Sequence, residues 1–304
     1  MMLKMFNRLE SGVMLIDKHA GITSHDVVDR IRKATGIRRI GHCGTLDPLA
    51  TGLLVICVGR YTRLSPWLTC ADKEYVSTFE FGSHSNNDDA DGTITMLSDI
   101  SPIEKKFLQD TLNNFRGSIM QIPPIYSAIR VGGQRSYKNA RSGKNIKLAP
   151  RPVVIDKLDL INYSYPEATF NIKCSKGTYI RAIARDLGKA CGSAGYVRKL
   201  RRTKVGSIYI NRSITLAEVE ERIKKGELNS CYTCVSDVLV DLPHLFIENQ
   251  PSLVKRFING NPIECLSEDN EEDYAVFDQK KQLLGIGRIS SGKLHPNSVM
   301  ATQF

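Results

Sequence analysis

Long apolar runs are missing from this sequence of 304 residues. No uninterrupted stretch reaches the about 18 apolar residues that a membrane-spanning helix needs, so no membrane span is expected. Residues 1–15 mix Lys4, Arg8 and Glu10 into their apolar positions and lack the core of a secretory signal. We therefore expect a cytoplasmic protein in which the eight cysteines are reduced thiols.

A surplus of acidic residues is also missing, because 42 Lys and Arg stand against 32 Asp and Glu and give a formal net charge of +10. Residues 235–304 hold 10 acidic and 6 basic residues, a net charge of −4, and this leaves +14 for residues 1–234. Phosphate neutralisation by Lys and Arg therefore predicts a polyanionic partner for residues 1–234. Charge alone leaves DNA, RNA and an anionic surface open.

The apolar pattern interleaves strands and helices without a regular βαβ rhythm, which favours an α+β protein with a mixed or antiparallel sheet flanked by helices and loops. Strands are predicted at residues 13–17, 53–58, 75–81 and 168–174. Helices are predicted after the N-cap residues Thr23, Ser101 and Thr215 and over residues 180–187.

A change in the sign of the charge near residues 231–241 predicts a domain boundary. We place a large basic domain at 1–234 and a small domain at 235–304. In the second part, short apolar runs alternate with Gly, Asp and Asn, which is typical of a small β-rich, barrel-like domain.

One loop presents a single carboxylate between glycines. The run Gly41-His-Cys-Gly-Thr-Leu-Asp47-Pro-Leu-Ala-Thr-Gly52 precedes a predicted buried strand, and the proline keeps Asp47 out of a helix. An acid held on a loop by a rigid scaffold is how catalytic groups are commonly presented. Taken by itself, the same Asp-Pro pair is also an ordinary turn former.

This run resembles the signature of the TruB-type tRNA pseudouridine synthases, and further matching motifs follow in the family's order over roughly residues 12–210. They are Lys73-Glu-Tyr75, Pro123-Pro-Ile-Tyr-Ser-Ala128, Ser175-Lys-Gly-Thr-Tyr-Ile-Arg181, Asp186-Leu-Gly188 and Leu200-Arg-Arg-Thr203. The resemblance implies the pseudouridine synthase fold, with a central mixed, mostly antiparallel sheet, and isomerisation of uridine 55 in the T loop of tRNA. That reaction oxidises and reduces nothing, so it implies no cofactor.

The resemblance assigns catalytic roles to Asp47, Tyr75 and Arg181. Asp47 takes the position of the essential aspartate, and Arg181 is the cation expected to hold its carboxylate through two bonds. Tyr75 is expected to stack on the uracil and to take part in the final proton transfer. Without the family, Arg181 reads as a surface cation and Tyr75 as one more core aromatic.

Three further residues are implied in substrate binding, namely His42, Tyr179 and Leu200. Tyr179 and Leu200 match positions that line the uridine pocket, and a place in the apolar core is an equal alternative for Leu200. His42 matches a residue that contacts flipped nucleotides, and a structural histidine is its alternative. The reaction implies base flipping, because the ribose C1′ is inaccessible within a folded loop.

Residues 126–151 carry seven basic residues, no acidic residue and two tyrosines, a pattern typical of an RNA-gripping element. A solvated basic face is the alternative. In the family this is the insertion that closes over the T arm. The predicted RNA-binding residues here are Arg130, Arg135, Lys138, Arg141, Lys144 and Lys147, and a second basic run adds Arg201 and Arg202.

Other features limit the interpretation. Cys231 and Cys234 have metal-ligand spacing but no second pair at zinc-site distance, so we predict no metal site. Residues 235–304 resemble the PUA-type RNA-binding domain of bacterial members, although their acidic run disfavours strong binding of phosphates.

The tRNA T arm is the expected partner. No protein partner is implied, and a monomer is expected. A non-catalytic RNA binder or tRNA-folding chaperone, and a guide-RNA-dependent synthase, are the rival functions.

Overall fold

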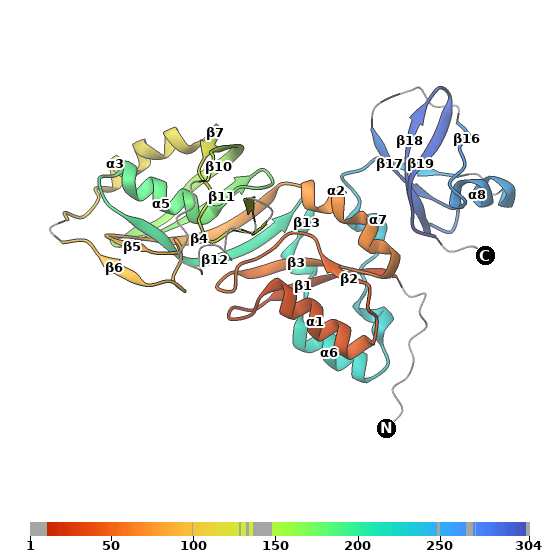
Figure 1. Ribbon diagram of the computed structural model, residues 1–304, viewed down its shortest axis with the longest axis horizontal. Helices are drawn as coiled ribbons and strands as arrows, with labels where there is room; N and C mark the ends of the chain where they lie inside the picture. Colours follow the sequence, from red (N-terminus) through yellow and green to blue (C-terminus); the bar gives the residue numbers. More distant parts are fainter. Residues whose placement is uncertain are drawn as a thin grey trace.

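Two main sheets, one large and one small, form the body of the molecule. The molecule is elongated, with the large sheet towards one end and the small sheet at the other (Figure 1). The computed structural model describes residues 11–98, 100–127, 129–131, 134–135, 148–247, 250–265, 270 and 272–301. No helix in these ranges is both long and apolar enough to cross a membrane.

The large sheet has ten strands, with eight in the order β14-β1-β3-β12-β4-β11-β10-β7, while β2 pairs with β3 and β13 with β12. Its strands are β1 (Gly12–Lys18), β2 (Ile40–His42), β3 (Thr51–Val58), β4 (Lys73–Phe81), β7 (Gly117–Gln121), β10 (Arg151–Ser164), β11 (Glu167–Cys174), β12 (Gly195–Val205), β13 (Ile208–Tyr209) and β14 (Ile214–Thr215). Only β1–β14 and β3–β12 pair in parallel within this described sheet. The predicted mixed, mostly antiparallel sheet is confirmed.

Strands β1 and β3 are buried on both faces, which explains their continuous apolar sequences. One face, which includes Met14 and Leu54, packs against the helices of the large domain. The opposite face, which includes Leu15 and Val55, packs against the residues that lead into the small domain.

Helices cover the first face of the sheet. They include α1 (Ser24–Thr35), α3 (Lys105–Thr111), α5 (Ile180–Ala190) and α6 (Leu216–Lys224), and the 3₁₀ helices η2 (Leu112–Phe115) and η4 (Leu228–Cys231) also contribute to this core. Figure 1 shows α1 and α6 side by side below β1 and β3, and α5 lies against β12. The remaining short helices are η1 (Gly59–Leu64), α2 (Ser65–Cys70), η3 (Ile210–Arg212) and α7 (Val235–Val238).

The capping predictions held at two helices and failed at one. Thr23 with Asp26 and Thr215 with Glu218 form complete capping boxes at the starts of α1 and α6. The helix predicted from Ser101 instead begins at Lys105. Ile103 is buried there, and its carbonyl accepts a hydrogen bond from the hydroxyl of Tyr163, so tertiary contacts keep this segment out of the helix.

The small sheet has the order β15-β17-β18-β19-β16. Its elements are β15 (His244–Phe246), α8 (Pro251–Ile258), β16 (Ile263–Glu264), β17 (Asp273–Phe277), β18 (Leu283–Ser290) and β19 (Lys293–Val299). Phe257 of α8 is fully buried in a core of its own. This β-rich unit is compatible with the predicted PUA-like domain, while the proposed boundary between residues 234 and 235 stays a prediction.

Contacts join the two units. Phe277 and Met300 belong to the same apolar cluster as Leu15 of the large sheet. Trp67 Nε1 donates to Asp273 Oδ2 at 2.8 Å, and Arg63 donates to the carbonyl of Val299. The small domain therefore packs on the face opposite the one that α1 and α6 cover.

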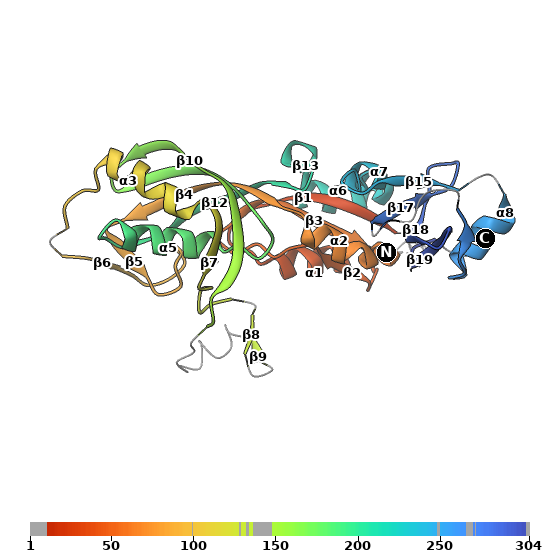
Figure 2. The ribbon, with the colours of Figure 1, turned by 90° about the horizontal axis from the view of Figure 1, so that it is seen from above.

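Two short pairs of strands stand outside these sheets. They are β5 (Ser83–Ser85) with β6 (Ile94–Met96), and β8 (Arg130–Val131) with β9 (Gln134–Arg135). Figure 2 shows β8 and β9 projecting from the body of the molecule near β7.

Candidate active site

The loop that carries Asp47 is fixed by contacts at both sides of the aspartate. Leu46 accepts from the hydroxyl of Ser24 through its carbonyl at 3.1 Å and donates its amide to the same hydroxyl at 2.8 Å. Gly21 donates its amide to the carbonyl of Pro48 at 2.9 Å. The Asp47 side chain is 31% exposed, so its carboxylate is held on a rigid loop yet reachable from solvent.

Lys18 supports this loop from the end of β1. Its ammonium donates to the carbonyls of His19 at 2.9 Å, Ile22 at 2.7 Å and Pro48 at 3.2 Å, which uses all three of its protons. The residue is fully buried. Burial lowers the pKa of Lys18 to about 8, and the negative charge of Asp47 acts in the opposite direction.

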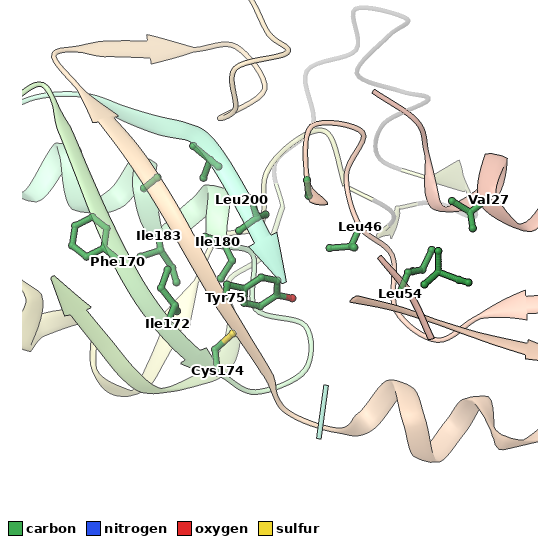
Figure 3. Packing of buried hydrophobic residues seen from close by; sticks show 14 of the residues in the cluster. Val27, Leu46, Leu54, Tyr75, Phe170, Ile172, Cys174, Ile180, Ile183 and Leu200 are labelled. Carbon is green, nitrogen blue, oxygen red and sulfur yellow. The ribbon is translucent and has the colours of Figure 1, made fainter. Parts of the chain in front are cut away.

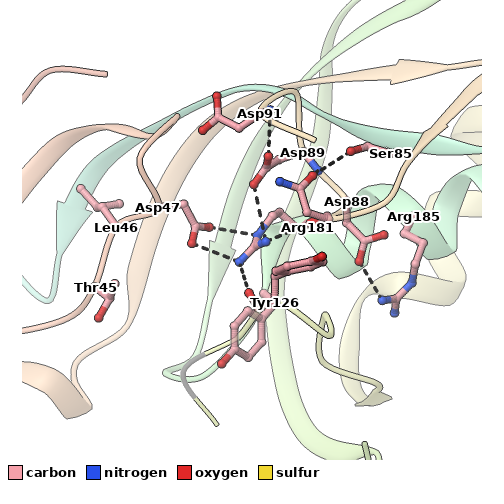
Figure 4. A network of polar contacts seen from close by, with 12 residues as sticks. Thr45, Leu46, Asp47, Ser85, Asp88, Asp89, Asp91, Tyr126, Arg181 and Arg185 are labelled. Atoms are coloured by element: carbon pink, nitrogen blue, oxygen red, sulfur yellow. Dashed lines mark hydrogen bonds and ion pairs between the residues drawn. The ribbon is translucent and has the colours of Figure 1, made fainter. Parts of the chain in front are cut away.

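Arg181, the second residue of α5, contacts the Asp47 carboxylate at two points (Figure 4). Nη2 donates to Oδ1 at 3.0 Å, and Nε lies 3.0 Å from Oδ2. The guanidinium also donates to the carbonyls of Asn87 and Tyr126, each at 2.9 Å. Because the arginine is only 5% exposed, these contacts compensate for burying its charge and fix its direction.

A second carboxylate, which is buried, lies on the other side of Arg181. Asp89 Oδ2 is 3.5 Å from Nη1, and its side chain is 4% exposed. Burial raises the pKa of Asp89, and the positive charge of Arg181 opposes that effect. Asp89 was not placed in the site from the sequence; the cluster of Asp88, Asp89 and Asp91 within a basic domain was the available signal.

The neighbouring pair of Asp88 and Arg185 extends this network. Asp88 Oδ2 is 3.0 Å from Arg185 Nη1, while Arg185 also pairs with Asp186. The backbone beside Asp88 bonds to β12, because Val197 donates to the carbonyl of Asp88 and accepts from the amide of Ala90, both at 3.0 Å. The acidic loop is thereby tied to the sheet.

Tyr75 and Leu200 lie together at the edge of the apolar core (Figure 3). They come from the adjacent strands β4 and β12, and both are buried. Burial raises the pKa of Tyr75 to about 12, so its hydroxyl keeps its proton at neutral pH. Leu200 is therefore part of the apolar core, and its place in the uridine pocket stays a prediction.

Tyr179 and His42 approach from two other elements. Tyr179 precedes α5, and its amide and carbonyl both bond to the side chain of Gln121, at 2.8 and 3.1 Å. Burial raises its pKa. His42 ends β2, and its Nδ1 is buried with no hydrogen-bond partner in the described part of the chain. Burial lowers the pKa of His42, which favours a neutral ring.

The sequence matches three protein-family models. It matches a TruB family pseudouridylate synthase N-terminal domain over residues 32–180, a tRNA pseudouridylate synthase B C-terminal domain over 181–240 and a pseudouridine synthase II TruB C-terminal domain over 249–300. It is 41% identical to the tRNA pseudouridine synthase B of Ruegeria pomeroyi, with 96% of each chain covered. The chain belongs to the TruB family of pseudouridine synthases.

Other relatives agree with this membership. The tRNA pseudouridine synthase B of Francisella philomiragia is 39% identical, with 95% of this chain and 94% of that protein covered. Among solved structures, a Cbf5-Nop10-Gar1 complex has a chain with a TM-score of 0.73 at 21% identity, covering 95% of this chain and 85% of that one. An H/ACA RNP bound to a substrate RNA gives 0.74 at 20% identity, with 97% and 86% covered. This likeness shows the pseudouridine synthase fold.

The prediction that Arg202 of this TruB-family chain binds RNA at the surface is wrong. Arg202 is 1% exposed, so its side chain is not available to grip a phosphate on the surface. Neighbouring residues on a strand face opposite sides, and the burial of Leu200 on β12 places Arg202 inside as well. Arg201 points outward and pairs with Asp17 at 2.7 Å.

The other predicted RNA contacts lie at the edge of what the structure describes. Arg130 and Arg135 are direct partners in the β8–β9 ladder, and their side chains are outside the description. Lys138, Arg141, Lys144 and Lys147 lie outside the described residues. Their role in RNA binding stays a prediction.

No group of three or more His, Cys, Asp and Glu side chains that could hold a metal ion occurs among the described residues. Cys231 is buried and Cys234 is exposed, and both are free thiols.

Proposed function

We propose that this chain is a tRNA pseudouridine synthase that converts uridine 55 of the T loop to pseudouridine, with Asp47 as its essential catalytic residue. The two-point contact between Arg181 and Asp47 is the observation that carries the proposal. It holds a carboxylate that is 31% exposed against a buried guanidinium, on a loop that is fixed on both sides of the aspartate. The name shared by relatives that are 34% to 43% identical supports tRNA as the substrate.

The reaction requires one carboxylate rather than a cofactor. The bond from ribose C1′ to N1 of uracil breaks, the base turns, and C1′ joins C5. The hydrogen at C5 is removed as a proton and N1 gains one, so atoms and electrons balance. Asp47 attacks or deprotonates the nucleoside, and Arg181 holds the carboxylate in position throughout.

The surrounding residues hold the flipped nucleotide. The Tyr75 ring stacks on the uracil and its protonated hydroxyl takes part in the last proton transfer, while Leu200 supplies an apolar wall. Tyr179 closes the pocket at the start of α5, where the side chain of Gln121 fixes its backbone. His42, with its uncommitted Nδ1, contacts the displaced nucleotides.

Binding of the T arm rests on the basic surface of residues 1–234. The insertion at 126–151 grips phosphates through its cations, and Arg201 adds a partly exposed cation beside the site. The PUA-like domain at 235–304 makes a weaker contact because its net charge is −4. The enzyme acts on tRNA as a monomer in the cytoplasm.

A direct assay tests this proposal. An unmodified T-arm stem-loop is incubated with the purified protein in the absence of any cofactor, and pseudouridine is mapped by position. Conversion at position 55 alone is the expected result, and a stem-loop with cytidine at that position is the control. Binding or refolding of tRNA without conversion overturns the proposal in favour of an RNA chaperone, and conversion only with a guide RNA overturns direct recognition.

A further inference from the structure

Arg202 lies where three neighbouring strands of the candidate site, β3, β12 and β4, are paired. On β12 it pairs in parallel with Gly52 of β3 and antiparallel with Tyr75 of β4. The approach to Gly52 is so close that a Cβ at that glycine would lie 2.2 Å from the carbonyl oxygen of Arg202, and Gly52 has a φ of +104°. The backbone of Arg202 is therefore locked against the end of the Asp47 loop.

The Arg202 side chain reaches both ends of that loop. Nε donates to the carbonyl of Leu53 at 2.7 Å, Nη2 to that of Gly44 at 3.1 Å, and Nη1 lies 3.5 Å from that of Thr45. One planar group thus bridges two chain positions nine residues apart, and Asp47 lies between them. A rigid fork with several donors suits this bridge, whereas a lysine carries its three donors on one nitrogen.

Arg202 also lies near Tyr75 and His42, two residues proposed to contact the nucleotide. Arg202 is the direct cross-strand partner of Tyr75, and its positive charge acts against the rise in the pKa of Tyr75 that burial causes. The charge also lowers the pKa of His42, after the larger effect of burial. The Arg202 side chain therefore contacts the Asp47 loop directly, while its backbone is paired with the strand that carries Tyr75.

We infer that Arg202 is a positioning residue, which sets the place of the Asp47 carboxylate relative to the Tyr75 ring without touching RNA. The inference rests on the function proposed above. Its physical basis is that reacting groups must be held in a narrow geometry, and a displacement of about 1 Å can reduce the rate by about 100-fold. The burial of the side chain at 1% exposure excludes a phosphate contact in this conformation.

Kinetic measurements separate positioning from binding. The variants are Arg202→Met, which removes the fork at similar length, and Arg202→Lys, which keeps the charge. Single-turnover rate constants at saturating protein are measured on the T-arm stem-loop together with its dissociation constant. Arg202→Met is expected to reduce the rate constant by about 100-fold with less than a twofold change in affinity. Arg202→Lys is expected to recover part of that loss.

Arg212→Met is the matched control, because Arg212 pairs with Asp237 on the surface and has no contact with the loop in its described bonds. It is expected to retain the rate constant and the affinity of the unaltered protein. A wild-type rate constant in Arg202→Met overturns the inference, as does a loss confined to affinity, which would assign Arg202 to RNA binding. If Arg202→Met does not fold, Arg202→Lys decides through the same comparison.

Hydrogen exchange of the free protein tests the inference without relying on activity. Amides of residues 44–53 are expected to exchange at least about tenfold faster in the Arg202 variants, while amides of β10 and β11 keep their rates. Unchanged exchange at 44–53 overturns the inference. A wild-type protein that is inactive on the stem-loop overturns the proposed function instead, and the exchange experiment still reports whether Arg202 holds the loop.

Discussion

Arg181 contacts Asp47 through two atoms, with Nε 3.0 Å from Oδ2 and Nη2 3.0 Å from Oδ1. Asp89 lies 3.5 Å from the same guanidinium and is almost completely buried, whereas the Asp47 side chain is 31% exposed. The buried carboxylate faces the guanidinium away from solvent, whereas the carboxylate of Asp47 is open to solvent. This asymmetry gives the two acids different expected roles.

Asp47→Asn is expected to abolish conversion of the T-arm stem-loop while binding changes by less than about threefold. The amide has the size of the carboxylate but carries no negative charge, so it neither attacks nor deprotonates the nucleoside. Pseudouridine mapping and a binding titration check the two parts. Normal turnover by this variant would contradict the assignment of Asp47.

Asp89→Asn is expected to reduce the rate by about tenfold and leave measurable activity. The change removes one of two carboxylates beside Arg181, so the guanidinium shifts towards Asp47 and disturbs its orientation. Asp88→Asn is the matched control, since Asp88 pairs with Arg185 and its φ of 65° is one that asparagine adopts readily. Equal losses in both variants would show that the acidic loop acts only through its fold.

Lys18→Met is expected to change how stability depends on pH. Because the pKa of Lys18 is about 8 when folded and 10.5 ordinarily, the unfolded chain binds more protons between these values, and Lys18 makes the free energy of unfolding rise with pH there. Below about pH 8 Lys18 is charged in both the folded and the unfolded state, so the cost of burying its charge lowers the free energy of unfolding by its full amount. The variant lacks this rise, so its stability relative to wild type should fall by about 2 kcal/mol from pH 8 to pH 10.

Urea unfolding at several pH values measures that difference. Lys33→Met is the control because Lys33 lies exposed in the last turn of α1. A difference between wild type and Lys18→Met that stays constant with pH would show that burial does not shift the pKa of Lys18.

Deletion of residues 135–147 is expected to weaken T-arm binding and to flatten its dependence on salt. Each phosphate contact that is lost reduces the slope of log affinity against log salt by about 0.7 to 0.9. A full-length variant with the five cations of this range replaced by Gln separates charge from length. An unchanged slope in both would remove the insertion from the RNA interface.

The sequence determined the elements whose signals are local. Thr23 and Thr215 begin helices because their side chains cap amides three residues ahead, and the runs in β1 and β3 form strands buried on both faces. The motif around Asp47 identified the family because its residues are contiguous. Each of these properties depends on neighbours in the chain.

Only the tertiary structure decided which side chains contact one another at the candidate site. Asp47 and Arg181 are separated by 134 residues, and only the packing of α5 against the sheet brings them together. Strand alternation requires Arg201 and Arg202 to face opposite sides, but the neighbouring strands β3 and β4 decide that Arg202 is the inward one. A buried arginine is satisfied by carbonyls that long-range folding supplies, and no local pattern shows where those carbonyls will lie.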